Sequence, residues 1–243
     1  MIAPMSGSRT DSRRGITRIA VFASGRGSNM EAVLRSIDRG DLRNARIVLV
    51  VSNNSGAGAL STARRRGIET AHVSSRTHPD RTACEQALLD LLASSRVDLI
   101  LLAGYMKMLP PRVVRAFSGR ILNIHPALLP RHGGRGMYGE RVHRAVLEAG
   151  DRESGATVHL VTEEYDEGEI VHQERVPVLP EDTPESLGAR VLEVEHRVYW
   201  RAVDRVVNGG HAPGSTATGR TRNVRPETAI PPRTAGADEE EQR

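Results

Sequence analysis

The sequence RIAVFASGRGSN, residues 18–29, decides the fold. It begins with a short apolar run of the kind that forms buried strands, and it continues into the glycine-rich turn SGRGS. Residues 29–39 then repeat apolar side chains at helical spacing, with Met30, Val33 and Ile37 on one face. A strand, a tight turn and a helix in this order predict the beginning of a βαβ unit and therefore a parallel sheet.

The same alternation continues along the chain. Apolar runs between helices are typical of a parallel sheet that is covered on both faces. The sequence therefore predicts an α/β fold, a Rossmann-like, mostly parallel sheet with helices on both faces, whose last two strands are antiparallel in character. Further strands are expected at 46–51, 68–73, 98–103, 120–124, 156–161 and 169–178, and further helices at 57–66, 80–93, 110–117, 141–149 and 183–207.

The two ends of the chain differ from the middle. Residues 1–17 are rich in Ser, Arg and Gly, and residues 214–243 are rich in Thr, Pro, Arg and Glu. Segments of this composition bury too little apolar surface to offset the entropy lost on ordering. We expect a disordered tail at each end and one domain over residues 18–213.

Composition excludes several classes of protein. The 243 residues carry a net charge of +4, spread along the chain, and only 3% are aromatic, so neither a basic face nor a base-stacking surface for nucleic acid is expected. The longest apolar run, residues 99–106, is far shorter than the ~20 residues of a membrane span. One cysteine, Cys84, excludes a disulfide scaffold, and the histidines show no metal-ligand spacing. A cytoplasmic protein without a metal is expected.

The turn Ser24–Asn29 is a candidate anion site. Its glycines let successive backbone N–H groups face one point, and the start of the helix adds partial positive charge, an arrangement suited to phosphate. A dinucleotide site would need glycine or alanine in place of Met30 and an acid near residues 52–54, where Ser-Asn-Asn stands. The Gly-Lys-Ser/Thr of a Walker loop is absent. The turn is therefore either a monophosphate loop or a plain tight turn.

A second candidate site is ILNIHP, residues 121–126. Alternation along a strand places Asn123 and His125 on one face, at the carboxyl end where sites of parallel sheets lie. An amide beside an imidazole can stabilise an oxyanion and move a proton. A histidine that merely satisfies a backbone carbonyl is the plain alternative. The acidic turn 163–169 and the segment 105–109, which holds the only lysine, are further candidates for an orienting acid and a ligand wall.

Together these segments resemble the folate-dependent formyltransferases, and among them those that act on glycinamide ribonucleotide. The resemblance covers residues 18–208. It rests on several motifs that occur in the family's order: SGxGSN at 24–29, LAGYMK at 102–107, LNIHPALLP at 122–130, GATVH at 155–159, YDEG at 165–168 and Glu195-His196.

The resemblance implies a reaction and a site. A formyl group would pass from 10-formyltetrahydrofolate to the amine of glycinamide ribonucleotide, with no metal and no covalent enzyme intermediate. The partners would be these two small molecules, and a homodimer is left open. The implied catalytic residues are Asn123, His125 and Asp166. The implied substrate phosphate residues are Gly27, Ser28 and Asn29, with Glu195 nearby. The implied folate residues are Tyr105, Met106, Lys107, Met108, Leu109, Val161 and Asp166.

Four other functions remain as alternatives. Methionyl-tRNA formyltransferase and formyltetrahydrofolate hydrolase carry an additional domain, for which residues 214–243 and 1–17 are too short. A sugar-nucleotide N-formyltransferase uses the same chemistry, although the loop at 24–29 favours a simple phosphate. A non-catalytic nucleotide-binding module would not need Asn123, His125 and Asp166 together.

The segment His132–Gly139 departs from the pattern of many members, because it is longer and carries four glycines. Glycines give a loop many backbone states, and such loops often close over a site to exclude water. We expect this segment to act as a lid, and a rigid surface excursion or a contact between copies is the alternative.

Overall fold

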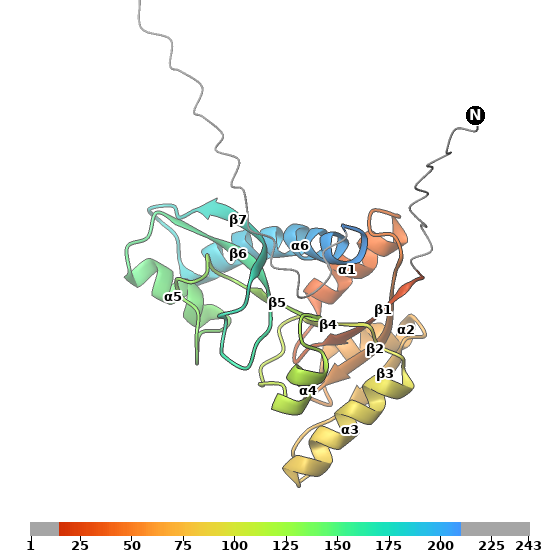
Figure 1. The fold of residues 1–243 in the computed structure, drawn as a ribbon. Helices are drawn as coiled ribbons and strands as arrows, with labels where there is room; N and C mark the ends of the chain where they lie inside the picture. The colour runs from red at the N-terminus through yellow and green to blue at the C-terminus, as the bar shows by residue number, and fades with distance from the viewer. Residues whose placement is uncertain (1–14, 210–243) are drawn as a thin grey trace, which may run out of the picture.

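A seven-stranded sheet organises the chain in the computed structural model, which describes residues 15–209 (Figure 1). The strand order is β3-β2-β1-β4-β5-β6-β7; the first five strands pair in parallel, and β6 and β7 join antiparallel. This confirms the predicted sheet. The strands are β1 (Thr17–Phe22), β2 (Ala45–Ser52), β3 (Glu69–His72), β4 (Leu99–Leu102), β5 (Ile121–His125), β6 (Glu153–Leu160) and β7 (Ile170–Pro177).

Almost all of the two predicted tails, 1–17 and 214–243, lies outside the described residues. Strand β1 begins at Thr17, one residue before the predicted domain.

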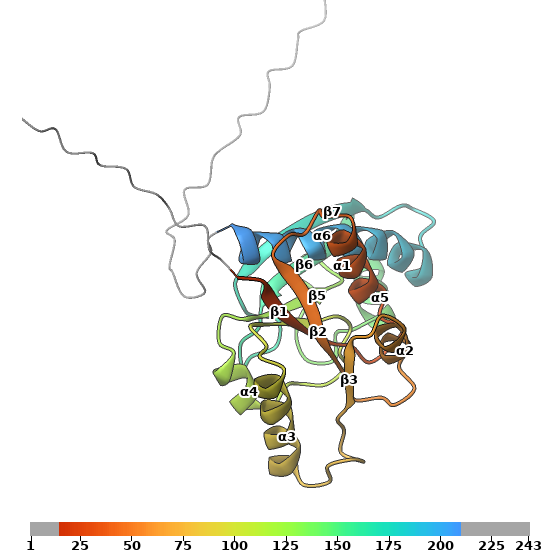
Figure 2. The ribbon, with the colours of Figure 1, turned by 90° about the vertical axis from the view of Figure 1, so that its right-hand side faces the viewer.

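Six helices cover the sheet on two sides (Figures 1 and 2). Helices α3 and α4 pack on one face, and the other four on the opposite face. None of the helices within residues 15–209 is both long and apolar enough to cross a membrane. The helices are α1 (Ser28–Asp38), α2 (Gly58–Arg65), α3 (Arg81–Ser94), α4 (Pro111–Ala116), α5 (Glu140–Glu148) and α6 (Pro184–Asn208).

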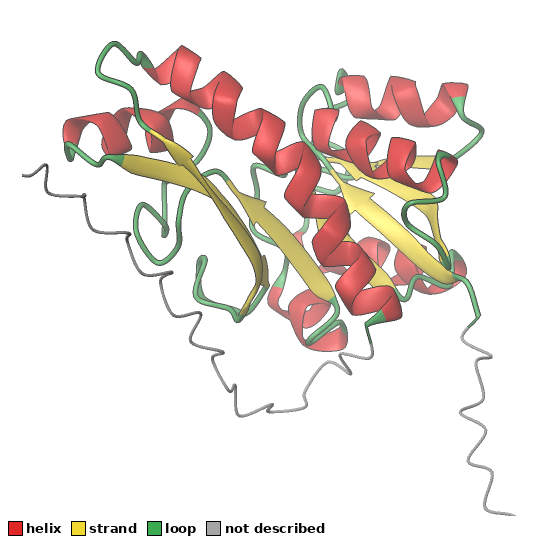
Figure 3. Ribbon diagram, turned by 90° about the horizontal axis from the view of Figure 1, so that it is seen from above, coloured by secondary structure: helices red, strands yellow, loops and turns green. Residues whose placement is uncertain are grey.

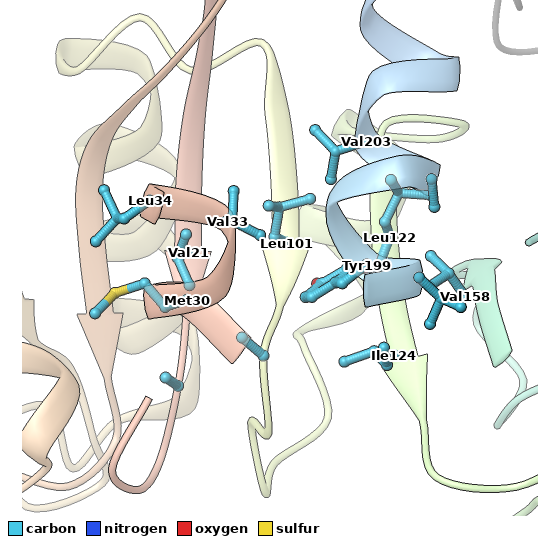
Figure 4. Close-up of a cluster of buried hydrophobic side chains, with 14 of the residues drawn as sticks. Val21, Met30, Val33, Leu34, Leu101, Leu122, Ile124, Val158, Tyr199 and Val203 are labelled. Carbon is cyan, nitrogen blue, oxygen red and sulfur yellow. The ribbon is translucent and has the colours of Figure 1, made fainter. Parts of the chain in front are cut away.

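Two hydrophobic cores result from this layering. In β1, Ile19 and Val21 face the core beneath α1 and α6, whereas Ala20 and Phe22 face the core beneath α3 and α4. All four are fully buried, as expected for a central strand whose side chains alternate between two covered faces. Figure 4 shows the first core, where side chains of α1 and α6 meet those of β1, β4, β5 and β6.

Helix α6 is the longest element and crosses the sheet (Figure 3). The Thr183 side chain accepts a hydrogen bond from the N–H of Ser186, and the Ser186 hydroxyl accepts one from the N–H of Thr183, which fixes where the helix begins. Further along, the fully buried Tyr199 hydroxyl lies 2.9 Å from the carbonyl oxygen of Leu102 and 3.3 Å from that of Leu122. The hydroxyl thereby joins the helix to the carboxyl end of β4 and to the beginning of β5.

The strand register near the end of β5 positions the polar side chains of this region. Asn123 lies opposite Leu102 on β4 and opposite His159 on β6, and His125 lies opposite Thr157. Because β6 is antiparallel, its side chains directly face those of β5, so the amide of Asn123 and the imidazole of His159 become neighbours.

Candidate active site

A cavity of about 550 Å³ opens at the carboxyl ends of β4 and β5. It brings together most of the residues that the sequence predicts for the site, although they come from segments far apart in the chain. Gly27 and Ser28 are the two predicted residues that do not line it. Those that do are Asn29, Tyr105, Met106, Lys107, Met108, Leu109, Asn123, His125, Val161, Asp166 and Glu195.

Asn123 is held by two groups. Its amide nitrogen lies 3.0 Å from Nε2 of His159 and 3.4 Å from Oδ1 of Asp166. Nδ1 of His159 lies 2.9 Å from the carbonyl oxygen of Leu160 and must donate to it, which leaves Nε2 of the neutral ring as an acceptor for the amide. The contact of the amide nitrogen with His159 is short, whereas its contact with Asp166 is long and therefore weak. The second N–H of the amide is therefore free to turn towards an oxygen in the cavity.

His125 is buried, with 3% of its surface exposed, and faces an acceptor on each side. Its Nε2 lies 2.8 Å from the carbonyl oxygen of His132, and its Nδ1 lies 3.6 Å from Oδ2 of Asp166. Burial lowers the pKa of His125 below its usual value, while Asp166 and the carbonyl of His132 pull it upward. The ring thus has low proton affinity in the free site but a carboxylate beside it that favours the cation.

Asp166 is the acid that links these groups. Burial alone would raise its pKa, but the neighbouring imidazoles of His159 and His125 and the N–H of Gly134 outweigh burial and keep the pKa below its usual value. Its backbone is left-handed, with φ 56°, and the N–H of Gly134 donates to Oδ2 at 3.0 Å. Asp166 is therefore held as a carboxylate facing both Asn123 and His125.

The segment His132–Gly139 reaches over the cavity, and Gly134, Gly136, Met137, Tyr138 and Gly139 line it. It is tied to the acid by Gly134, and a Cβ on Gly133 would stand 2.6 Å from Cδ2 of Leu129 and 3.3 Å from Cβ of Asp166. A side chain at Gly133 would therefore press against Leu129 and Asp166, and the role of the segment as a lid stays a prediction.

The predicted phosphate loop forms the start of α1. Gly27 has φ 85°, and a Cβ there would lie 2.7 Å from Cβ of Ala59, so only glycine fits. No side chain caps this end of the helix, although capping residues are common at such ends. The backbone N–H groups at Ser28 and Asn29 are left for an anion, which is the arrangement that suits a phosphate.

Asn29 and Glu195 extend this loop into the cavity. The Asn29 amide nitrogen donates to Oε2 of Glu195 at 2.6 Å, joining the first helix to the last. Burial raises the pKa of Glu195 to about 7, against the lowering effect of this hydrogen bond. Oδ1 of Asn29 is buried and has no partner in the free site. Two buried polar groups are thus available to a ligand with several hydroxyls.

The segment Tyr105–Leu109 forms the opposite wall, with Met106 and Met108 about half exposed. Ser24 holds it: the N–H of Ser24 donates to the Gly104 carbonyl at 3.0 Å, and the N–H of Met106 donates to Oγ of Ser24 at 2.8 Å. The Ser24 hydroxyl donates in turn to Oδ1 of Asn53 at 2.5 Å. The wall is therefore positioned by the same loop that begins the predicted phosphate site.

Two residues of this site, His159 and His143, are not among the site residues that the sequence predicts. The sequence marks His159 only as part of a motif, because its pairing with Asn123 depends on the antiparallel register of β5 and β6. His143 on α5 lines the cavity and is 7% exposed, yet its Nδ1 has no partner. No signal in the sequence marks His143, since its helical position looks like any other on an amphipathic face. Residues 15–209 hold no group of three or more His, Cys, Asp or Glu side chains arranged to bind a metal ion.

Several known proteins are similar to this chain. The protein is similar to a chloroplastic phosphoribosylglycinamide formyltransferase of Arabidopsis thaliana, with 44% identity over 207 residues, 85% of this chain and 70% of that protein. It is 42% identical to a phosphoribosylglycinamide formyltransferase of Haemophilus influenzae, over 75% of this chain and 83% of that one. Among solved structures, glycinamide ribonucleotide transformylase 1 from Symbiobacterium toebii superposes with a TM-score of 0.76 and 40% identity, covering 84% of this chain and 93% of that one.

These relatives share one domain with this protein. The model of the formyl transferase family matches residues 17–203, which include every strand and most of α6. The chain therefore belongs to the formyl transferase family.

Proposed function

We propose that this protein transfers a formyl group from 10-formyltetrahydrofolate to the amine of glycinamide ribonucleotide. The observation that carries the proposal is the convergence of Asn123, His125 and Asp166 on one cavity, which also holds the Tyr105–Leu109 wall and the Asn29–Glu195 pair. A flat donor and a phosphorylated acceptor can thus approach the same three side chains from opposite sides.

The acceptor is assigned to the α1 side. A ribonucleotide phosphate accepts from the uncapped N–H groups at Ser28 and Asn29. The ribose hydroxyls then donate to the Glu195 carboxylate and to Oδ1 of Asn29, whose buried oxygen otherwise lacks a partner. This placement directs the glycinamide amine towards the end of β5.

The donor is assigned to the other wall. The half-exposed side chains of Met106 and Met108, together with Val161, give an apolar slot for a flat ring system. Backbone groups of the Tyr105–Leu109 segment supply hydrogen bonds, because the bond from the N–H of Met106 to Ser24 holds this segment in place. The formyl group then lies beside Asn123 and His125.

The reaction follows from this arrangement. The amine attacks the formyl carbon, and the electron pair of the C=O bond moves to oxygen, forming a tetrahedral intermediate with a negative charge. The loosely held N–H of Asn123 and Nδ1–H of protonated His125 donate to that oxygen. The intermediate collapses when the oxygen lone pair re-forms C=O and N10 of the folate leaves, taking the proton that the amine gives up.

Asp166 serves the proton transfer. As a carboxylate 3.6 Å from Nδ1 of His125, it stabilises the imidazolium. It also holds the water that carries the proton from the amine to N10.

The remaining expectations stay part of this proposal. The substrates are small molecules, no nucleic acid takes part, and the protein acts in the cytoplasm. Whether two copies associate is left to measurement of the mass in solution.

The test is an assay of the purified protein with 10-formyltetrahydrofolate and one of three acceptors. We expect loss of the formyl donor with glycinamide ribonucleotide, and none with an amino-sugar nucleotide or with water alone. Turnover only with the amino-sugar nucleotide would identify a sugar N-formyltransferase. Release of formate at the same rate without any amine would identify a hydrolase.

A further inference from the structure

The mechanism above leaves one of the two partners of His125 without a role. Nε2 of His125 lies 2.8 Å from the backbone carbonyl of His132, so this nitrogen carries a hydrogen and donates it. The carbonyl therefore determines which ring nitrogen faces Asp166 and the cavity. What holds that carbonyl in place determines how well the catalytic ring is oriented.

His132 is held in an unusual way. Its backbone is left-handed, with φ 55°, a conformation that residues other than glycine rarely adopt. Its own side chain is anchored, because Nε2 of His132 lies 2.7 Å from Oδ2 of Asp151 in the turn between α5 and β6. Arg131 binds the other oxygen of the same carboxylate. Such a backbone persists when its surroundings hold it, and here they do so through Asp151.

Asp151 is placed for this task. Its side chain is 8% exposed, whereas the side chain of Arg131 is 64% exposed, so the carboxylate is directed inward at His132. The hydrogen bond with His132 is also the main cause that lowers the pKa of Asp151. Asp151 does not line the cavity, so it contacts no substrate. Its influence on the reaction has to pass through His132.

We propose that Asp151 and the His132 side chain form a latch, a pair of positioning residues that sets the His132 carbonyl against Nε2 of His125 and thereby fixes the orientation of the catalytic ring. The inference rests on the proposed function, because it assigns His125 the catalytic role. The latch makes Nδ1 the nitrogen that exchanges a proton beside Asp166. Without the latch the imidazole ring of His125 can rotate, and either ring nitrogen can then face Asp166.

The latch has an effect that can be measured without substrate. The titratable groups around His125 are Asp166, His159, His132 and His143. Asp166 and the His132 carbonyl raise the pKa of His125, whereas burial and the neighbouring imidazoles lower it. Loss of the carbonyl contact therefore lowers the pKa of His125 further.

Two variants release the latch. Asp151→Ala removes the anchor, and His132→Asn keeps a residue that tolerates left-handed backbone but has too short a side chain to reach Asp151. We expect each to lower kcat about tenfold, the scale of one lost orienting hydrogen bond, with both KM values changed less than about twofold. The double variant should be no slower than either single variant, because both break the same contact. Asp151→Asn keeps an oxygen acceptor for His132 and should restore part of kcat.

A matched control separates the latch from general destabilisation. Glu174 is also a partly buried carboxylate with arginine partners, Arg197 and Arg201, and like Asp151 it does not line the cavity. Glu174→Ala should lower the melting temperature and leave kcat unchanged.

The deciding measurement is the NMR titration of the His125 ring in the ligand-free protein. The midpoint should move to lower pH in Asp151→Ala and in His132→Asn, and the corresponding limb of the pH profile of kcat/KM should move with it. An unchanged midpoint in folded Asp151→Ala overturns the latch, even where kcat falls. If the wild-type protein forms no formylated product, the proposed function fails, while the titration still decides whether the latch exists.

Discussion

At the scale of single residues, the proposed mechanism depends most on His125. Replacing it with alanine removes a donor to the oxyanion, a loss that costs about 2.7–4 kcal/mol of barrier. We expect His125→Ala to lower kcat about 10²- to 10³-fold and to leave folate binding nearly unchanged, as measured by steady-state kinetics and calorimetry.

The partly buried His78 offers the control, because it lies outside the cavity. His78→Ala should retain full turnover. A His125→Ala enzyme with more than about a tenth of wild-type kcat would contradict the catalytic role.

Glu195 connects the site to the pH dependence of stability. Its pKa is about 7 in the folded protein, above the usual carboxyl value, because of burial. The folded state therefore holds this proton more tightly than the unfolded state, so the stability that it contributes is greatest below the usual pKa. That stability is lost as the pH rises through about 7.

We expect the free protein to lose up to about 3 kcal/mol of unfolding free energy between pH 5 and pH 8 through this one group. Glu195→Gln cannot ionise and should lose less over the same range. Urea unfolding of both proteins at the two pH values measures the difference. Parallel pH curves would show that Glu195 keeps an ordinary pKa.

Individual residues also show which features of the site can be predicted from the sequence and which cannot. Asn123 and His125 were predicted to share a strand face, and the structure confirms it, because alternation along a strand is a local property. The contact of His159 with Asn123 depends on the register of two strands about 36 residues apart. The latch of Asp151 and His132 depends on how a turn and a loop fold over the strand end. Neither contact can be predicted from local periodicity, because each joins residues of different elements.

At the scale of elements, the β1–α1 loop serves both walls of the cavity. Its Ser24 holds the Tyr105–Leu109 segment, and its Ser28 begins the uncapped helix. We expect Ser24→Ala to raise the KM for the folate several-fold and to leave the KM for the ribonucleotide nearly unchanged, because the lost contact is to the N–H of Met106.

Ser28→Asp should affect the KM for the ribonucleotide rather than the KM for the folate. A carboxylate at the open end of α1 repels the substrate phosphate, so the KM for the ribonucleotide should rise far more than that for the folate. Equal changes for both substrates in both variants would show that the loop acts only through overall stability.

The order and kind of the elements were predictable. Every expected strand and helix is present within a few residues, because continuous apolar strands and amphipathic helices leave clear patterns. The proposals that the Tyr105–Leu109 wall binds folate and that Asp166 is the orienting acid rest on the resemblance to a family. Composition alone left the acidic turn as a solvated loop, since nothing local distinguishes Asp166 from its acidic neighbours.

At the scale of the whole molecule, α6 ties the parallel and antiparallel parts of the sheet together. Tyr199→Phe keeps the packing but leaves the carbonyls of Leu102 and Leu122 without this donor. We expect a loss of about 1–3 kcal/mol of unfolding free energy in urea, with kcat close to that of wild type.

The exposed Tyr165 provides the comparison, since Tyr165→Phe removes a hydroxyl from a side chain that is 42% exposed. That variant should unfold at the wild-type urea concentration. Equal stability of both variants would show that the buried hydroxyl adds nothing to the sheet.

The hydrogen bond between Asn29 and Glu195 joins residues 166 positions apart, near the two ends of the described chain. A ribosome releases the first of these residues long before the second, so a growing chain has no complete acceptor site until α6 has emerged and docked. Formylation of the ribonucleotide by a nascent or clipped chain should therefore begin only when the last helix is present. Activity therefore requires that synthesis has passed the last helix and that this helix has docked against α1.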